Sequence, residues 1–163
     1  MKKFMASLFA ASVVLAGCAT APLSPEQVAI DNVLKVDSTL AGNSVSIAQV
    51  SSAVETISMG SVPKAFKDAY KENVSAWKSF AELEKKMYAA DLEKAQSDIK
   101  SFLGEYGSNP TKAIVDLKSK WPQFEKQLDE IFEKLRNAYT GYTTSATTFG
   151  VPYPDNSFFS NLF

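Results

Sequence analysis

The chain of 163 residues contains no histidine and a single cysteine. Without histidine it lacks the commonest general base, and it cannot form Ser-His or Cys-His nucleophile pairs. The Glu-x-x-His metal motif of helical bundles is excluded for the same reason. One cysteine cannot form an internal disulfide, so a packed core must stabilise the fold. We therefore expect no catalytic residues, no metal site and no cofactor.

An excess of positive charge is also missing. Lysine and arginine total 17 against 18 aspartates and glutamates, which gives a formal net charge of −1. Proteins that bind nucleic acid carry clustered Lys and Arg that neutralise phosphates, so we expect no nucleic-acid partner. Hydrophobic residues make up 45% of the chain, which suffices for the core of a single domain.

A short apolar run follows a basic start. Lys2 and Lys3 precede an uncharged stretch from Phe4 to Leu15. At about 1.5 Å per helical residue this stretch spans about 18 Å, well short of the roughly 30 Å hydrocarbon core of a bilayer. The combination is typical of an export signal and not of a membrane span.

The run closes on Leu15-Ala16-Gly17-Cys18, which resembles the lipobox of bacterial lipoprotein precursors. The resemblance implies cleavage between Gly17 and Cys18, a diacylglyceryl group on the Cys18 sulfur and acylation of the new amino terminus. Two or more acyl chains anchor a protein stably, whereas one binds only marginally. An aspartate after the cysteine retains such lipoproteins at the inner membrane, so Ala19 favours the outer membrane, facing the periplasm. A buried or reactive thiol in a secreted protein is the alternative.

These features divide the chain into four expected segments. They are a signal peptide that is removed (1–17), a lipidated tether (18–24), a helical domain (25–139) and a C-terminal tail (140–163). The first expected partner is the membrane, through the lipid anchor. The second is another envelope protein or a second copy of the chain, because heptad seams serve both intramolecular bundles and intermolecular coiled coils.

Apolar residues spaced by three and four predict three long helices, at about 25–59, 63–106 and 110–139. Each of the two turns between them contains a glycine that ends one helix and, three residues later, a proline that begins the next. Short turns cannot carry the chain back along a long helix, so neighbouring helices must be antiparallel. The predicted fold class is all-α, an elongated, coiled-coil-like three-helix bundle with an irregular tail.

Each predicted helix contains one irregularity. Gly42 and Asn43 interrupt the first, but its apolar seam stays in phase, which favours a continuous helix with Asn43 buried over a break at this point. In the second, a phase shift near 83–87 predicts local unwinding within a continuous helix. In the third, Pro122 predicts a kink, with two collinear helices as the alternative.

The tail is rich in aromatic side chains, which disordered segments usually lack. Its rings are Tyr142, Phe149, Tyr153, Phe158, Phe159 and Phe163. Packing back into grooves of the bundle is favoured, and docking to another protein is the alternative. With Cys18 in the membrane and three antiparallel helices, residues after Tyr139 are expected at the end of the bundle away from the membrane.

One set of carboxylates falls outside the apolar seams, which predicts a solvated helix face: Glu82, Glu84, Asp129, Glu130 and Glu133.

The main functional expectation is a non-catalytic envelope lipoprotein with a structural or protein-interaction role. The alternative is a binding module for a small apolar or lipid ligand in a cavity lined by Trp77, Phe80, Tyr88, Trp121 and Phe124.

Overall fold

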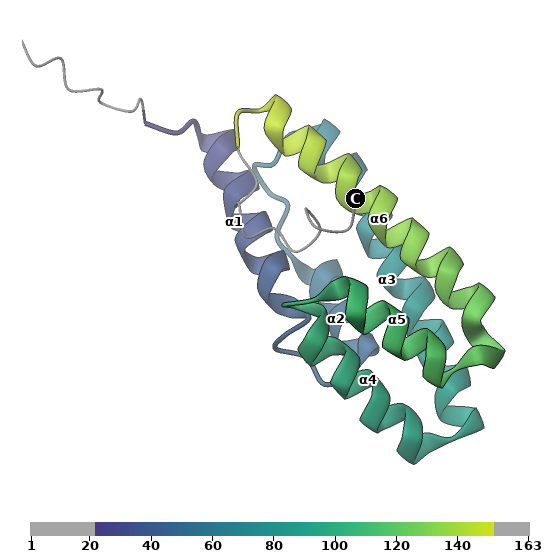
Figure 1. Cartoon of the computed structure of the whole chain (residues 1–163). Coiled ribbons are helices and arrows are strands. Elements are labelled where there is room, and N and C mark those ends of the chain that lie inside the picture. The colour runs from purple at the N-terminus through teal and green to yellow at the C-terminus, as the bar shows by residue number, and fades with distance from the viewer. Residues whose placement is uncertain (1–21, 152–163) are drawn as a thin grey trace, which may run out of the picture.

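The structure is a computed structural model that describes residues 22–151. Over this range the fold is all-α, as the sequence predicts, and contains no strand. The α-helices are α1 (Pro25–Leu40), α2 (Ile47–Thr56), α3 (Lys64–Ala90), α4 (Leu92–Tyr106), α5 (Pro110–Lys120) and α6 (Glu125–Thr148), with a short 3-10 helix η1 (Pro122–Phe124) before α6. Successive helices alternate in direction along the bundle (Figure 1). None of the helices within 22–151 is long and apolar enough to cross a membrane.

The predicted three-helix bundle is not confirmed, because each predicted long helix is divided in two. The first helix ends at Leu40, and the chain turns before Ser46 caps α2. The carboxylate of Glu84 on α3 accepts the backbone N–H groups of Ile47 at 2.8 Å and of Ala48 at 2.9 Å. This long-range cap fixes the start of a separate helix. The predicted continuity through Gly42 and Asn43 is therefore wrong, and Asn43 is exposed.

The second predicted helix breaks at Asp91, after the expected irregularity at 83–87, which is regular α-helix. Asp91 is extended (φ −160°), and its side chain accepts the backbone N–H of Lys94 at 3.0 Å, so it caps α4. The chain then folds back, and the rings of Phe80 and Phe102 meet at 5.5 Å between centroids. Ring packing across α3 and α4 accounts for the reversal, which a local phase shift does not predict.

The third predicted helix reverses at Pro122 and is neither kinked nor collinear. Trp121 leaves the helical region (φ −130°, ψ 58°), and η1 leads into α6. The indole Nε1 of Trp121 donates to Asp98 on α4 at 3.0 Å, and this hydrogen bond holds the end of α5 against α4. Beyond the turn, α6 packs on α3, where the rings of Phe132 and Phe80 lie 5.5 Å apart.

Buried side chains form two clusters. The larger, which we call the large core, contains side chains from all five helices from α2 through α6. It is centred on five neighbouring rings: Trp77, Phe80, Phe102, Tyr106 and Phe132. The smaller, which we call the α1 cluster, joins α1 to the start of α3 and the end of α6. Its members are Ile30, Val33, Leu34, Val62, Phe66, Tyr70, Tyr139, Tyr142, Ala146 and Val151.

The last helix continues well past the predicted end at Tyr139. It runs to Thr148, so the predicted irregular tail from residue 140 begins as helix. Tyr142 is buried in the α1 cluster, and Phe149 packs against it. These two rings therefore pack back onto the bundle. The other four tail rings lie outside the described residues, as do Gly17 and Cys18.

The end of α6 lies beside the start of α1. Gln27 in the first turn of α1 donates from Nε2 to the carbonyl oxygen of Phe149 at 3.0 Å. Gly150 adopts φ +74°, a conformation that favours glycine, and turns the chain so that Val151 is 3% exposed in the α1 cluster. An even number of alternating helices returns the chain to the end where it began. The expectation that residues after Tyr139 lie at the opposite end is therefore wrong.

Candidate functional site

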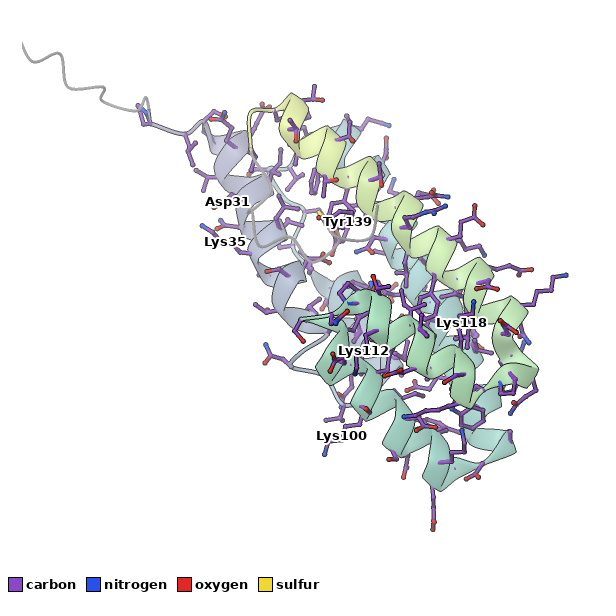
Figure 2. The ribbon with its side chains drawn as sticks, in the orientation of Figure 1. Asp31, Lys35, Lys100, Lys112, Lys118 and Tyr139 are labelled. Carbon is purple, nitrogen blue, oxygen red and sulfur yellow. The ribbon has the colours of Figure 1, made fainter. Side chains whose placement is uncertain are left out.

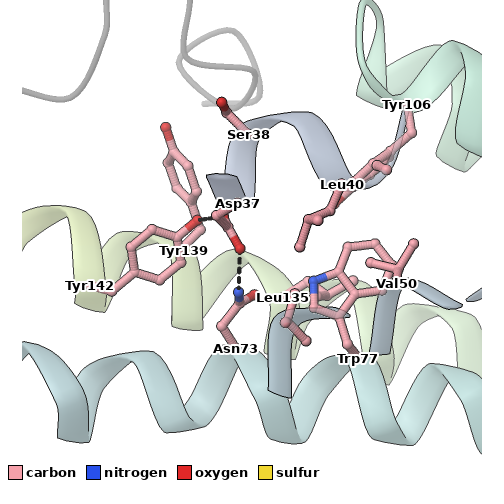
Figure 3. Close-up of a pocket in the computed structure, with 12 residues that line it drawn as sticks. Asp37, Ser38, Leu40, Val50, Asn73, Trp77, Tyr106, Leu135, Tyr139 and Tyr142 are labelled. Carbon is pink, nitrogen blue, oxygen red and sulfur yellow. Dashed lines mark hydrogen bonds between the residues drawn. The ribbon is translucent and has the colours of Figure 1, made fainter. Parts of the chain in front are cut away.

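A carboxylate on α1 is hydrogen-bonded to two other helices. Asp37 Oδ1 accepts the hydroxyl of Tyr70 and, at 3.2 Å, Nδ2 of Asn73, both from α3. Asp37 Oδ2 accepts the hydroxyl of Tyr142 from α6 at 3.0 Å. Figure 3 shows Asp37, Asn73 and Tyr142 converging from three helices. Asp37 therefore links α1 to both α3 and α6.

The surroundings of Asp37 favour its neutral form. Burial raises the pKa of its carboxyl group above the ordinary aspartate value of 3.8, and the hydrogen bonds from Tyr70, Tyr142 and Asn73 lower the pKa by less. None of the ion pairs formed within residues 22–151 includes Asp37. The three groups that donate to Asp37, from Tyr70, Asn73 and Tyr142, are all uncharged.

A small cavity opens beside this carboxylate. It has a volume of about 50 Å³ and walls from α1, α2, α3, α6 and the end of α4. Its lining is Asp37, Ser38, Leu40, Ala41, Val50, Val54, Asn73, Trp77, Tyr106, Leu135, Tyr139 and Tyr142 (Figure 3). A cavity of about 150 Å³ holds benzene, and drug-sized ligands need several hundred. This cavity can therefore hold a small head group or a pair of waters, with apolar walls on one side and Asp37 on the other.

Most of the rings predicted to line a ligand cavity lie elsewhere in the fold. Trp77 is among the lining residues, but Phe80 and Trp121 are buried in the large core. Phe124 stacks on Trp121 at 6.0 Å. The hydroxyl of Tyr88 donates to Glu84 at 2.9 Å, and burial together with that carboxylate raises the pKa of Tyr88 to about 12. The structure thus brings one of the five predicted rings to the cavity.

Sequence reasoning missed Asp37 because a charged residue in an amphipathic helix is normally assigned to the solvated face. A signal was present in the spacing. Asp37 follows Ile30, Val33 and Leu34 at steps of three and four, which places it on the buried face of α1. An aspartate in phase with a buried stripe predicts a hydrogen-bonded carboxylate.

The predicted solvated carboxylates include one error. Glu84 is 1% exposed, and its oxygens accept the N–H groups that begin α2 as well as the Tyr88 hydroxyl. An α-helix leaves its first N–H groups unpaired and carries a partial positive charge there, so a buried carboxylate is stable at this position. Glu82, Asp129, Glu130 and Glu133 are exposed. Glu84 is thus a structural cap.

A third polar cluster joins α4 to α5. Asp98 lies 2.9 Å from Nζ of Lys94 and 3.1 Å from Nζ of Lys120, and it also accepts the Trp121 indole N–H. Burial acts to raise the pKa of Asp98, but the hydrogen bonds and charges of the two lysines lower it overall. Nζ of Lys94 also lies 3.8 Å from the centre of the Trp121 ring. The cluster is fully paired, so it acts as a structural link.

A wider groove lies on the surface between α3 and α6. Its volume is about 320 Å³, and it is lined by Ala69, Glu72, Ser75, Ala76, Lys134, Asn137, Ala138 and Gly141. Small and charged side chains form its walls, and no aromatic ring contributes. A search of residues 22–151 for three or more His, Cys, Asp or Glu side chains arranged to hold a metal ion finds no group.

Comparisons with protein families, with curated proteins and with solved structures find no match to this chain.

Proposed function

We propose that this protein is a non-catalytic lipoprotein of the bacterial cell envelope. Acyl chains on Cys18 anchor it to a membrane, with Ala19 favouring the outer membrane and the periplasmic face. Its helical domain has a structural or protein-interaction role. The observation that carries the proposal is the resemblance of Leu15-Ala16-Gly17-Cys18 to a lipobox, placed at the end of a short apolar run.

The point along the chain where the folded domain begins, shortly after Cys18, supports this proposal. Ser24 begins the first helix with a capping box, in which its hydroxyl oxygen accepts the Gln27 N–H at 3.2 Å and its own N–H donates to Gln27 Oε1 at 2.7 Å. Residues 19–24 thus separate the cysteine from the folded domain. At about 3.5 Å per extended residue they allow about 20 Å, enough to hold a folded domain just above a lipid surface.

The test uses the single cysteine. Protein extracted from membranes is expected to lack residues 1–17, to carry the added mass of acyl chains and to be unreactive toward a maleimide. The Cys18→Ala variant is expected to retain residues 1–17 without acyl mass, whereas the Ser24→Ala control, outside the motif, is processed like wild type. A wild-type chain that reacts with maleimide and carries no acyl mass would contradict the proposal.

The interaction role needs a separate experiment. Crosslinking in intact cells is expected to trap the wild-type chain with a discrete envelope protein or with a second copy of itself. A chain ending at Val151 is the matched comparison, because it keeps all of α6 and the buried Val151. Crosslinking that yields free monomer alone in every membrane preparation would count against the role.

A second candidate function, ligand binding, is favoured by the cavity beside Asp37. The cavity combines a carboxylate without an ion-pair partner among the described residues with apolar walls. A primary ammonium on a short alkyl chain matches both features, because the cation would pair with Asp37 and the alkyl group would contact Trp77 and Leu40. The rest of a larger ligand would stay outside the cavity.

n-Butylammonium is a suitable probe for this candidate. Saturable chemical-shift changes are expected at the Trp77 indole in the wild type and not in Asp37→Asn. Asp31→Asn is the matched control, because Asp31 pairs with Lys35 on the outer side of α1 (Figure 2). Equal titration of all three proteins would contradict binding at Asp37.

A further inference from the structure

We propose that the surface groove between α3 and α6 is the contact through which two copies of this chain associate. In this dimer α6 of each copy lies in the groove of the other. The inference names a surface and a partner for the interaction role, and in that respect it rests on the proposed function. It uses residues 22–151 alone and does not require acylation of Cys18.

The groove lies where α3 and α6 run side by side in opposite directions (Figure 1). Its residues fall between two ring contacts, Phe66 with Tyr142 at 6.2 Å and Phe80 with Phe132 at 5.5 Å between centroids. Between these contacts one buried alanine from each helix lines the groove, and a volume of about 320 Å³ stays open. Small side chains at a contact let the axes of two helices approach to about 8 Å. The groove can therefore receive the side of another helix.

A glycine in the wall formed by α6 points to close approach from outside. Gly141 lies inside this helix, whereas Gly150 is the one glycine with positive φ among residues 22–151. A β-carbon built at Gly141 would meet no neighbouring atom of the described chain within 4 Å. Glycine is a poor helix former that proteins use for positive φ or for close approach to the backbone. The described fold needs Gly141 for neither purpose, so a helix of a second molecule accounts for it.

The two sides of the groove carry opposite charges. Glu72 on α3 and Lys134 on α6 are both exposed, and neither belongs to an ion pair within residues 22–151. The other six lining residues are uncharged. A two-fold axis parallel to the helices places α6 of one copy beside α3 of the other. Lys134 of each copy then faces Glu72 of the other, so the contact is made twice.

This symmetry favours a second copy over an unrelated partner. An unrelated partner would need one anion and one cation at matching positions, with a narrow helix surface between them. A second copy supplies both charges, and the side of α6 that enters the groove is itself narrow, because it carries Ala138 and Gly141. The same axis places the first turn of α1 at one end of the dimer in both copies. Two chains anchored to one membrane require that arrangement.

The experiment counts copies in the full chain, purified from cells in a large excess of detergent micelles. Native mass spectrometry strips the detergent and reports both the number of copies and the acyl mass of each chain. The wild type is expected to change from dimer to monomer on dilution, which yields a dissociation constant. A chain that is monomeric at every concentration would overturn the inference.

The glycine gives a variant that blocks association without removing any contact of the fold. Gly141→Gln is expected to raise the dissociation constant at least about tenfold, because its side chain keeps the second helix away. The thermal midpoint of the dilute variant should not fall, since a β-carbon at this position meets nothing and glutamine favours helix. Gly104→Gln is the matched control, because Gly104 is equally open but lies in the last turn of α4. Equal dissociation constants for the three proteins would mean that the copies associate elsewhere, and the inference would be wrong.

Exchanging the two charges tests their pairing. Glu72→Lys and Lys134→Glu are each expected to weaken association about tenfold, because like charges then face one another. The two single variants shift the net charge in opposite directions, so a general effect of charge cannot explain losses in both. The double variant restores the net charge and should associate within about threefold of wild type. A double variant no better than the single ones would refute the pairing and, with it, this dimer.

A crosslink locates the contact directly. A carbodiimide activates a carboxylate and joins it to a nearby amine as an amide. In a mixture of unlabelled and isotope-labelled wild-type chains, an amide between Glu72 and Lys134 is expected to join the two kinds of chain. Crosslinks from Glu72 to a different protein alone would overturn the choice of a second copy. An acylated chain that stays monomeric refutes the inference alone, whereas a chain that forms this crosslink without acyl mass refutes the lipoprotein proposal alone.

Discussion

The large core and the α1 cluster hold their helices by different means. The large core packs the rings of α3, α4 and α6 against one another, whereas α1 contributes three buried apolar side chains, Ile30, Val33 and Leu34. What fixes α1 in addition is directional: the hydrogen bonds to Asp37 and the bond from Gln27 to Phe149. Apolar burial depends little on pH, but a carboxylate at the centre of a hydrogen-bond network does.

This difference predicts unequal stability within one domain. Each fully buried large apolar side chain contributes about 1.5–3 kcal/mol, so the large core greatly exceeds what α1 can supply. Regions with few buried apolar contacts open at lower free energy than the rest of a protein. We therefore expect α1 to detach locally while α2 to α6 stay folded. The following predictions test that contrast.

The largest effect is expected from Phe80→Ala. Phe80 is fully buried and meets the rings of Phe102 and Phe132, so its removal leaves a cavity at the centre of the large core. Loss of such a ring typically costs about 3–5 kcal/mol. Urea unfolding followed by circular dichroism should show this decrease for the whole domain. Val115→Ala, at an exposed position, is the control and should change stability by less than about 0.5 kcal/mol.

A smaller effect is expected from Glu84→Gln. The substitution keeps the shape but removes the charge, and its amide cannot accept two N–H groups as the carboxylate accepts those of Ile47 and Ala48. Hydrogen bonds to charged groups contribute about 1.5–3 kcal/mol, which sets the expected loss in the urea experiment. Glu55→Gln, in an exposed pair with Lys78, should cost little. Equal losses for the two variants would contradict the capping role.

These residues also show where sequence reasoning succeeds and where it fails. The start of α1 at Ser24 is encoded locally by a capping box, and it was predicted correctly. The three irregularities were located near their true positions, but their outcome was not predicted. An apolar seam in phase across a break looks the same whether the two halves are collinear or folded back. The choice is made by contacts between distant residues, such as Glu84 with Ile47 and Phe80 with Phe102.

The candidate site is harder still to predict from sequence. Asp37, Asn73 and Tyr142 are far apart along the chain, and their meeting depends on α1 and α6 lying antiparallel. That arrangement follows from the six α-helices formed by residues 22–151, whereas a three-helix bundle would have placed Tyr142 at the other end. The wrong prediction of three helices therefore left the contact between Asp37 and Tyr142 unpredicted. It also put the C-terminal end of α6 at the wrong end of the bundle.

A local effect is expected from Tyr142→Phe. The change removes the hydroxyl that donates to Asp37 and keeps the buried ring, so about 1 kcal/mol of α1 docking should be lost. Amide hydrogen exchange should quicken several-fold in α1 and remain unchanged in α4 and α5. In an Asp37→Asn background the same substitution should have a smaller effect, because the two residues act as a pair. Uniform acceleration in all helices would mean that α1 is not a separate unit.

The smallest effect is a dependence on pH that is confined to α1. The pKa of Asp37 is raised above 3.8 in the fold, so the native state binds more protons than the unfolded chain between these two values. Docking of α1 is therefore strongest below pH 3.8 and weakens as the pH rises through the folded pKa. Asp37→Asn cannot titrate, so the difference in urea midpoint between it and wild type should change with pH in that sense.

Other carboxylates give the opposite dependence of stability on pH. Wild type and Asp37→Asn must therefore be compared with each other at each pH. The pKa of Asp98 is lowered by Lys94 and Lys120, and that of Asp68 is lowered to about 2 by Lys64 and Lys71. Their stabilisation is present above 3.8 and is lost as the pH falls through their folded pKa values. Both contributions cancel between wild type and Asp37→Asn. A difference that grows in favour of wild type as the pH rises would show that ionised Asp37, with its three neutral donors, stabilises the α1 interface.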